Sequence, residues 1–351
     1  MTPLPFGPPL KPMLGRLARE LPRQGHVYEP KWDGFRAIAF KDGDEVDVRS
    51  RHDRPLARYF PEVVDGLRAL DEPRVVLDGE IVLTGSFDFP TLMRRLHPAK
   101  TRADRLAAEA PAAFVAFDLL ALGDEDLRDA PFTDRRARLE QLRTTPPIHV
   151  TPATEDPARA EDWLERFQGA GIDGVIAKPR AARYEPGARA IVKVKRERTA
   201  DCVIAGLRFH AGRPMVGSLL LGLYDDGGAL VHVGVASQFA ERRRLELLDE
   251  LRPLAVPLEG HPWEHGYSLQ GGETGRLPGA AGRWDPRDMP LDWIPLAIER
   301  VAELAYDQVD RGRFRHPARF RRWRPDREPR SCTFDQLDAV APPLGELLAA
   351  R

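Results

Sequence analysis

Short strand-like runs fill most of this chain, and the way in which they follow one another changes near residue 199. Up to that point strand-like and helix-like runs alternate, with helical patterns at 133–143 and 156–171. The runs that predict strands are 34–40, 45–50, 74–83, 112–122, 171–178 and 190–196. Because pairs of strands are separated by helices, we expect a mixed α+β domain with antiparallel sheets.

The residues after 199 predict a second domain of a different kind. Three strand-like runs with turn signals between them lead into one amphipathic helix, at 201–209, 216–225, 228–236 and 239–251. A Gly- and Pro-rich stretch at 257–289 predicts a long loop, and the pattern at 298–310 fits either a helix or a strand. Short strands with a single helix are typical of a small Greek-key barrel of the OB type. For a chain of 351 residues we therefore expect two domains, 1–198 and 199–351.

Composition excludes several classes of protein. Cys202 and Cys332 are the only cysteines, so neither a disulfide framework nor a four-cysteine zinc module is available. No stretch approaches about 18 consecutive apolar residues, and the start, MTPLPFGPPLKPM, lacks the basic segment and apolar run of a secretory signal. The glycines of 271–282 have no Gly-Lys-Ser/Thr and no preceding strand, which excludes a P-loop there. We expect a cytoplasmic protein that does not enter a membrane.

Positive charge is concentrated in one segment of a nearly neutral chain. The 53 basic and 54 acidic side chains give a net charge of −1, yet residues 311–330 contain nine arginines against two acids. A charge run of this kind is often a solvated tail. Here Phe314, Phe320 and Trp323 are interleaved with the arginines, which favours an ordered anion-binding segment and keeps a nucleic-acid partner open.

Lysine is rare in this chain, which makes its lysines informative. Seven lysines stand against 46 arginines, and four of the seven lie beside strand-like runs: Lys31, Lys178, Lys193 and Lys195. An arginine keeps its proton in a protein, whereas a lysine can lose one and act as a nucleophile. Lys193 and Lys195 alternate with valines, so in a strand both ammonium groups would face one side, where an anion between them would relieve their repulsion.

The sharpest local signal is the run Lys31-Trp32-Asp33-Gly34-Phe35-Arg36, which follows Tyr28-Glu29-Pro30. Alone, this run is also compatible with a simple turn between two strands. Its significance rises because further short motifs follow it in order. They are Ser50-Arg51, Asp78-Gly79-Glu80, Phe114 to Asp118, Asp173 to Lys178, Lys193 to Lys195, and the arginine-rich segment.

This ordered set resembles the covalent nucleotidyltransferase superfamily, which comprises ATP-dependent DNA ligases, RNA ligases and mRNA-capping enzymes. The resemblance spans roughly residues 25–327 and is nearest to small bacterial ATP-dependent DNA ligases, of the ligase C type and the ligase module of ligase D. It implies a nucleotidyltransferase (adenylation) domain followed by an OB-fold barrel, and an enzyme that seals nicks in duplex DNA through lysyl-AMP and DNA-adenylate intermediates. An RNA ligase or a capping-type enzyme is the alternative within the superfamily. A non-catalytic nucleic-acid-binding protein built on an OB barrel is the alternative outside it.

The resemblance also implies roles for individual residues. Lys31 would be the catalytic residue, whose amine attacks the α-phosphate of ATP. Glu29 and Phe117 would hold the adenine. Arg36 and Arg51 would contact ribose and phosphate oxygens. The remaining nucleotide contacts would come from Glu80, Lys178, Arg189, Lys193, Lys195, Arg324, Asp326 and Arg327.

The same resemblance implies a metal ion and partners. Glu80 and Asp173 would hold Mg²⁺ or Mn²⁺ through oxygen ligands, with a ribose contact as the alternative for Glu80. Asp173 stands where the family usually has Glu, and Arg327 stands where it usually has Lys, so the metal and pyrophosphate contacts would differ in reach. The implied partner is nicked duplex DNA, with a Ku-type end-binding protein or a repair polymerase beside it in DNA repair. We expect the chain to be a monomer.

Overall fold

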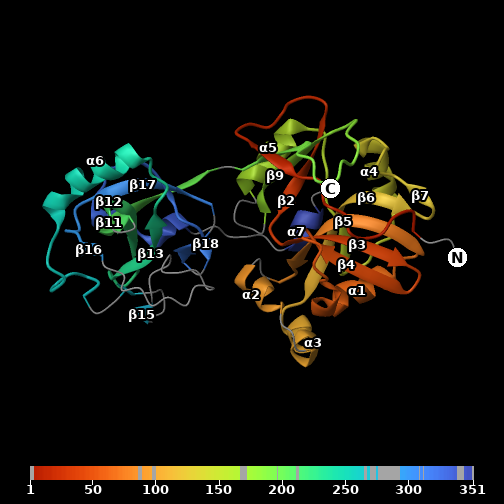
Figure 1. Cartoon of the computed structure of the whole chain (residues 1–351), viewed down its shortest axis with the longest axis horizontal. Helices are drawn as coiled ribbons and strands as arrows, with labels where there is room; N and C mark the ends of the chain where they lie inside the picture. The colour runs from red at the N-terminus through yellow and green to blue at the C-terminus, as the bar shows by residue number, and fades with distance from the viewer. Residues whose placement is uncertain are drawn as a thin grey trace. The chain divides into compact units, whose positions relative to one another are not determined.

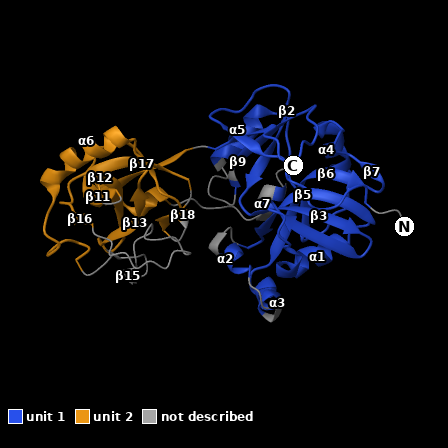
Figure 2. Cartoon of the chain, viewed as in Figure 1, with its two compact units in different colours: residues 1–196, 339–351 blue, residues 197–338 orange. Residues whose placement is uncertain are grey.

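Two compact units make up the chain in the computed structural model (Figure 1, Figure 2). Unit 1 consists of residues 1–196 and 339–351, and unit 2 consists of residues 197–338. The boundary predicted after residue 198 lies close to this division, but the prediction assigned 339–351 to the second domain, and the structure groups that segment with unit 1. The structure describes residues 4–85, 89–96, 100–166, 172–195, 197–210, 213–264, 267–268, 274–275, 293–307, 309–310, 312–337 and 344–349.

Two sheets form the body of unit 1. Their strands are β1 (Gly15–Ala18), β2 (His26–Trp32), β3 (Phe35–Asp42), β4 (Glu45–Ser50), β5 (Arg74–Leu83), β6 (Ala112–Leu122), β7 (Glu125–Asp126), β8 (Ile148–Val150), β9 (Ile172–Pro179) and β10 (Ile191–Val194). One sheet has the order β4-β3-β5-β6-β7 with β8 beside β6, and the other has the order β1-β10-β9-β2. β1 runs parallel to β10 and β8 parallel to β6, while β2, β3, β5 and β9 pair antiparallel with their neighbours.

The helices of unit 1 are α1 (Pro61–Arg68), α2 (Phe89–Arg94), α3 (Lys100–Glu109), α4 (Phe132–Gln141), α5 (Pro157–Arg166) and α7 (Leu344–Ala349), with a short 3₁₀ turn η1 (Ala57–Tyr59). Helices α1, α4 and α5 pack against these sheets, and α2 and α3 project beyond them (Figure 1). β6 is buried on both faces, since Phe114 and Ala116 pack in a cluster that α1 joins, and Val115 and Phe117 pack in a second cluster that α5 joins. Its single acid, Asp118, therefore needs a cationic partner inside the core.

Unit 2 is built around one curved sheet. Its strands are β11 (Arg198–His210), β12 (Arg213–Tyr224), β13 (Leu230–Ala236), β16 (Ile294–Pro295), β17 (Val301–Tyr306) and β20 (Arg319–Trp323), in the order β13-β12-β11-β17-β20 with β16 beside β11. A parallel bridge from Ala236 to Ala318 links the two ends of this order. The predicted α+β class and the OB-type barrel are thus confirmed. The smaller elements are α6 (Glu241–Leu251), β14 (Tyr267–Ser268), β15 (Thr274–Gly275), β18 (Val309–Asp310), β19 (Arg313–Phe314) and the 3₁₀ turns η2 (Arg252–Leu254), η3 (Pro329–Ser331) and η4 (Phe334–Leu337).

The ambiguous pattern at 298–310 resolves as the strand β17. It pairs with β11 on one side and with β20 on the other, and both partners are distant in sequence. Most of the loop predicted at 257–289 lies outside the described residues. Among the helices that the structure describes, none is long and apolar enough to cross a membrane.

Candidate active site

A pocket in unit 1 collects many of the side chains that the sequence motifs singled out. Eight of the predicted nucleotide-site residues line it: Glu29, Lys31, Arg36, Arg51, Glu80, Phe117, Lys178 and Lys193. The rest of its wall is mainly apolar and consists of Pro12, Met13, Leu14, Gly15, Pro30, Trp32, Ile176 and Ile191. A mainly apolar wall with a few converging charged groups is the usual form of a small-molecule site.

Lys31 lies in β2 opposite an extra residue of β9, which forms a β-bulge. The register between β2 and β9 shifts between Pro30 and Trp32, so that Lys31 lies at the shift. Trp32 is buried and donates from Nε1 to Thr151 Oγ1 at 2.9 Å, which fixes the strand just beyond it. Bulges re-aim single side chains and are frequent beside active sites. Lys31 therefore lines the pocket at the point where the regular pairing of β2 with β9 is interrupted.

The contact between Gly34 and Glu80 brings a carboxyl group next to the lysine-bearing strand. The Gly34 N–H donates to Glu80 Oε1 at 3.1 Å. A Cβ at position 34 would lie 2.1 Å from the Ile81 carbonyl oxygen, so only glycine allows this close approach of β3 to β5. Burial raises the pKa of Glu80 to about 7, although the nearby charges of Arg36 and Lys31 lower it. The Glu80 carboxyl group thus changes its charge near neutral pH and responds to any further cation.

Arg36 is fixed at the wall of the pocket. Its Nε and Nη2 each donate to Asp78 at 2.6 Å, and Nη2 also reaches the Met13 carbonyl oxygen at 3.4 Å. Burial opposes the guanidinium charge, but the Asp78 carboxylate outweighs burial and raises the pKa of Arg36. The guanidinium lies over Phe117, with Cζ 4.4 Å from the ring centroid. Phe117, the expected platform for adenine, therefore carries a cation on its ring.

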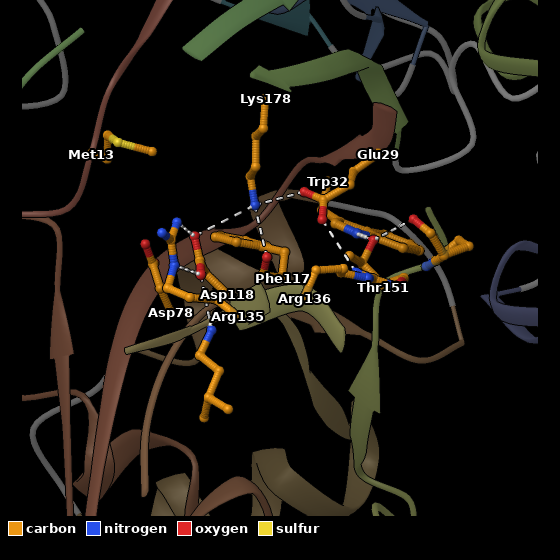
Figure 3. A network of polar contacts seen from close by, with 12 residues as sticks. Met13, Glu29, Trp32, Asp78, Phe117, Asp118, Arg135, Arg136, Thr151 and Lys178 are labelled. Atoms are coloured by element: carbon orange, nitrogen blue, oxygen red, sulfur yellow. Dashed lines mark hydrogen bonds and ion pairs between the residues drawn. The ribbon is translucent and has the colours of Figure 1, made fainter. Parts of the chain in front are cut away.

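Glu29 and Lys178 form a buried ion pair at this pocket (Figure 3). The Lys178 ammonium lies 2.8 Å from Glu29 Oε2 and donates to the Phe117 carbonyl oxygen at 2.7 Å. The two side chains are only 3% and 2% exposed. Arg136 of α4 places a second cation on Glu29 at 3.2 Å and donates to the Thr151 carbonyl oxygen at 2.6 Å. Direct contact of Glu29 and Lys178 with a nucleotide stays a prediction, and the structure shows that these two groups engage each other.

A second buried pair adjoins the first (Figure 3). Arg135 donates from Nε to Asp118 Oδ1 at 2.7 Å and from Nη2 to Asp118 Oδ2 at 3.0 Å. Lys178 Nζ lies 4.0 Å from Asp118 Oδ2, which joins the two pairs into one network. Arg135 and Arg136 were not predicted as site residues, because adjacent arginines in a charged helix resemble a solvated face. The available signal was Asp118, a single acid in an apolar strand that requires a cation.

Two predicted residues of unit 1 do not line this wall, and the side chain of a third is not described. Arg189 precedes β10 and is exposed, and Lys195 follows β10. Neither residue is among the described residues that line the pocket. Asp173 lies in β9, and its side chain is outside the part that the structure describes. Gly174, next to it, has φ 141°, and a Cβ there would lie 2.2 Å from the Val194 carbonyl oxygen and 3.2 Å from Lys195 Cγ. This close approach brings β9 against the side chain of Lys195.

The predicted residues of the C-terminal motif lie in unit 2 and form a cluster of their own. Arg324 donates from Nη1 to both carboxylate oxygens of Asp201, at 3.0 and 2.8 Å, and from Nη2 to Asp326 at 2.8 Å. The hydrogen bond from Arg324 lowers the pKa of Asp326 to about 2. Arg327 Nε lies 3.4 Å from the same Asp201, which is 8% exposed. Asp201 therefore holds both arginines, and sequence analysis did not identify it.

Part of the arginine-rich segment forms the ordered strand β20, as predicted, and not a solvated tail. Phe320 packs against the core of unit 2, while Arg319 and Arg321 lie on either side of it in the strand. Both guanidinium groups donate to the single carboxylate of Glu197. The two arginine side chains are 45% and 44% exposed, so they stay accessible to a phosphate backbone.

A divalent metal ion is compatible with the pocket, although its ligands within the protein are few. Within the described ranges, no three His, Cys, Asp or Glu side chains come together as a metal site. Mg²⁺ in nucleotide sites takes most of its ligands from phosphates and water, with one or two carboxylates from the protein. Glu80 fits that role, because it lines the pocket and any nearby cation favours its ionised form.

Comparison with known proteins gives a consistent result. A family model described as "ATP dependent DNA ligase domain" matches residues 12–195, and one described as "ATP dependent DNA ligase C terminal region" matches residues 212–327. The chain is 49% identical to DNA ligase C2 of Mycolicibacterium smegmatis, with 96% of each chain covered. It is 48% identical to DNA ligase C of Mycobacterium tuberculosis, with 95% of each covered. A solved structure of a Lig E DNA ligase has a TM-score of 0.51 at 19% identity, over 89% of this chain and 99% of that chain, and so shares the fold.

Proposed function

The chain belongs to the ATP-dependent DNA ligase family, and we propose that Lys31 is the residue through which it uses ATP. The observation that carries this proposal is the placement of Lys31 at a β-bulge in a pocket whose wall also holds Glu80, Arg36 and Lys193. An amine, a carboxyl group and two further cations at one pocket suit the transfer of a nucleotidyl group from a triphosphate.

The first step makes a covalent intermediate. The uncharged Lys31 amine attacks the α-phosphorus of ATP and a phosphorus–nitrogen bond forms. The bond from the α-phosphorus to the bridging oxygen breaks, pyrophosphate leaves, and the nitrogen releases one proton to solvent. Nearby positive charge favours the uncharged amine, and Arg36 and Lys193 line the same pocket. AMP then passes to the 5′-phosphate of a nick, and the 3′-hydroxyl displaces it as the strands are joined.

The metal ion and the adenine would use the remaining groups of the pocket. Glu80 would hold Mg²⁺ or Mn²⁺, which supplies charge compensation for the phosphates, and Asp173 stays the second predicted ligand. Glu29, held by two cations, is an acceptor and suits the exocyclic amine of adenine, whereas guanine would present an oxygen at that place. This arrangement supports ATP over GTP.

Unit 2 would supply the contacts to DNA. The exposed arginines of β20 suit phosphate contacts, which do not depend on base sequence, as the sealing of any nick requires. Affinity for nicked duplex DNA should therefore fall as salt rises. We extend the proposal to a monomeric, cytoplasmic enzyme of DNA repair, with a Ku-type end-binding protein or a repair polymerase as the class of partner that the family resemblance implies.

The test is transfer of label from nucleotide to protein. The full chain is incubated with Mg²⁺ and ATP or GTP labelled at the α-phosphate, and protein-bound label is read on a denaturing gel. We expect label from ATP in the wild type and none in Lys31→Ala. Lys11→Ala is the matched control, because Lys11 is exposed and outside the pocket wall. Label that persists in Lys31→Ala, or that comes from GTP and not from ATP, would contradict the proposal.

A further inference from the structure

Tyr184 joins parts of the pocket that are distant in sequence. It lies in the connection between β9 and β10 and is 3% exposed. Its hydroxyl donates to Asp78 Oδ2 at 2.6 Å and accepts a hydrogen bond from the Met13 N–H at 3.2 Å. Met13 is part of the pocket wall, and Asp78 is the carboxylate that holds Arg36. One hydroxyl group therefore contacts two supports of the same pocket, although it does not line the pocket itself.

The direction of these hydrogen bonds is fixed by charge. Burial and the Asp78 carboxylate raise the pKa of Tyr184 well above its usual value, so the phenol keeps its proton and donates it to Asp78. Asp78 Oδ2 thus receives two donors, the Tyr184 hydroxyl and Arg36 Nη2, both at 2.6 Å. Asp78 is fully buried, so loss of the tyrosine donor leaves its carboxylate with acceptor capacity that water does not fill.

The backbone around Tyr184 holds the hydroxyl in place. The Tyr184 N–H donates to the Arg128 carbonyl oxygen at 2.7 Å. Further along the same connection, the Ala188 carbonyl oxygen accepts from the Leu14 N–H at 2.7 Å, which ties the connection to the wall segment that contains Met13. The hydroxyl is therefore a fixed reference point between the wall segment and Asp78.

The orientation of Arg36 depends on Asp78. Two of its three guanidinium nitrogens are used on that carboxylate, and within the described residues Nη1 contacts no acceptor. The guanidinium plane is also stacked on Phe117. A ligand oxygen would meet Nη1 at a position that Asp78 determines.

We propose that Tyr184 is a positioning residue for ATP, which acts through Asp78 on Arg36 and through Met13 on the wall of the pocket. This inference rests on the proposed function, that ATP binds in this pocket. Tyr184 is not among the residues that line the pocket. Its hydroxyl should therefore affect how tightly ATP is held in the first step, and not the transfer of AMP once it is bound to the protein.

The experiment compares Tyr184→Phe with the wild type in two separate reactions. In self-adenylylation, the KM for ATP should rise about tenfold, as expected for one lost hydrogen bond to a charged group, and the rate at saturating ATP should stay within about twofold. In single-turnover nick sealing by enzyme that already carries AMP, with no ATP added, the rate should stay within about twofold. A variant that merely folds poorly would lose both reactions together.

Two controls make the outcome decisive. Tyr306→Phe removes the hydroxyl of another buried tyrosine, which stacks on Phe314 in unit 2, and it should leave the KM for ATP unchanged. In an Arg36→Ala background, Tyr184→Phe should change the KM by less than about threefold, because its main target is gone. An unchanged KM in Tyr184→Phe, the same rise in Tyr306→Phe, or a full effect without Arg36 would overturn the inference. Absence of label in the wild type would instead overturn the proposed function.

Discussion

Replacement of Lys178 by methionine should destabilise unit 1 strongly, although it removes only one charge. Methionine keeps most of the length of the side chain but leaves Glu29 with Arg136 as its remaining cation, at 3.2 Å. At the observed separation of 2.8 Å, the attraction between the Lys178 and Glu29 charges is about 6 kcal/mol for an effective dielectric constant of about 20. Desolvation offsets part of this attraction, and measured losses on breaking buried pairs are about 3–5 kcal/mol.

We expect a loss of about 3 kcal/mol in the free energy of unfolding, at the low end of that range, because Arg136 still compensates Glu29. This corresponds to a rise of more than about 100-fold in the unfolding constant. Hydrogen exchange of peptides from β2 and β9, measured as a function of urea, reports on unit 1 separately from unit 2. The double variant Lys178→Met/Glu29→Gln should lose about 2 kcal/mol less free energy of unfolding than the sum of the two single variants, since the two groups act as a pair.

The matched control is Arg180→Met, two residues further along the chain. Arg180 pairs with Glu155, and these side chains are 51% and 55% exposed. An exposed pair contributes less than about 1 kcal/mol. An equal loss in the free energy of unfolding for Lys178→Met and Arg180→Met would show that burial does not make this network essential to the stability of unit 1.

Two further predictions concern unit 2. Burial, reinforced by the charges of Arg313 and Arg208, lowers the pKa of His232 from 6.5 to about 3, so unfolding takes up a proton below pH 6.5. His232 should therefore reduce the free energy of unfolding of unit 2 by about 2 kcal/mol when the pH falls from 7 to 5. In urea titrations at the two pH values, His232→Gln should abolish this reduction. An equal pH dependence in the wild type and in His232→Gln would refute the prediction. Glu197→Gln removes the carboxylate that pairs with two arginines of β20. In fluorescence anisotropy it should tighten binding of nicked duplex DNA about twofold to fivefold at low salt and steepen the salt dependence of binding. The control Glu155→Gln in unit 1 should change neither the affinity nor its salt dependence.

The strands were predictable because their signals are local. The run 112–122 is apolar except for Asp118, and it is the interior strand β6. Glu80 lies in the predicted strand 74–83, whereas β2, which carries Lys31, was not predicted as a strand. The structure brings both side chains to one pocket. The pattern at 298–310 could not be resolved in this way, because this segment is a strand, β17, through its pairing with β11 and β20 outside the segment.

The residues that support the site could not be predicted, because their roles depend on long-range meetings. Arg136 is one of 46 arginines, and only the fold brings it to Glu29. Tyr184 lies in a connection with no motif, and Asp201 opens a strand far from Arg324 in sequence. Each supplies a single partner for a motif residue, and such a partner leaves no periodic trace in the sequence.

Unit 2 is an insertion in the topological sense, since the chain leaves unit 1 after residue 196 and returns to it at 339. Leu348 of α7 packs in the cluster that contains Trp32, the neighbour of Lys31. Two backbone connections therefore join the units. A protease that cuts the first of them leaves unit 2 covalently attached only to residues 339–351, so the two products stay together through the packing of α7 against the rest of unit 1.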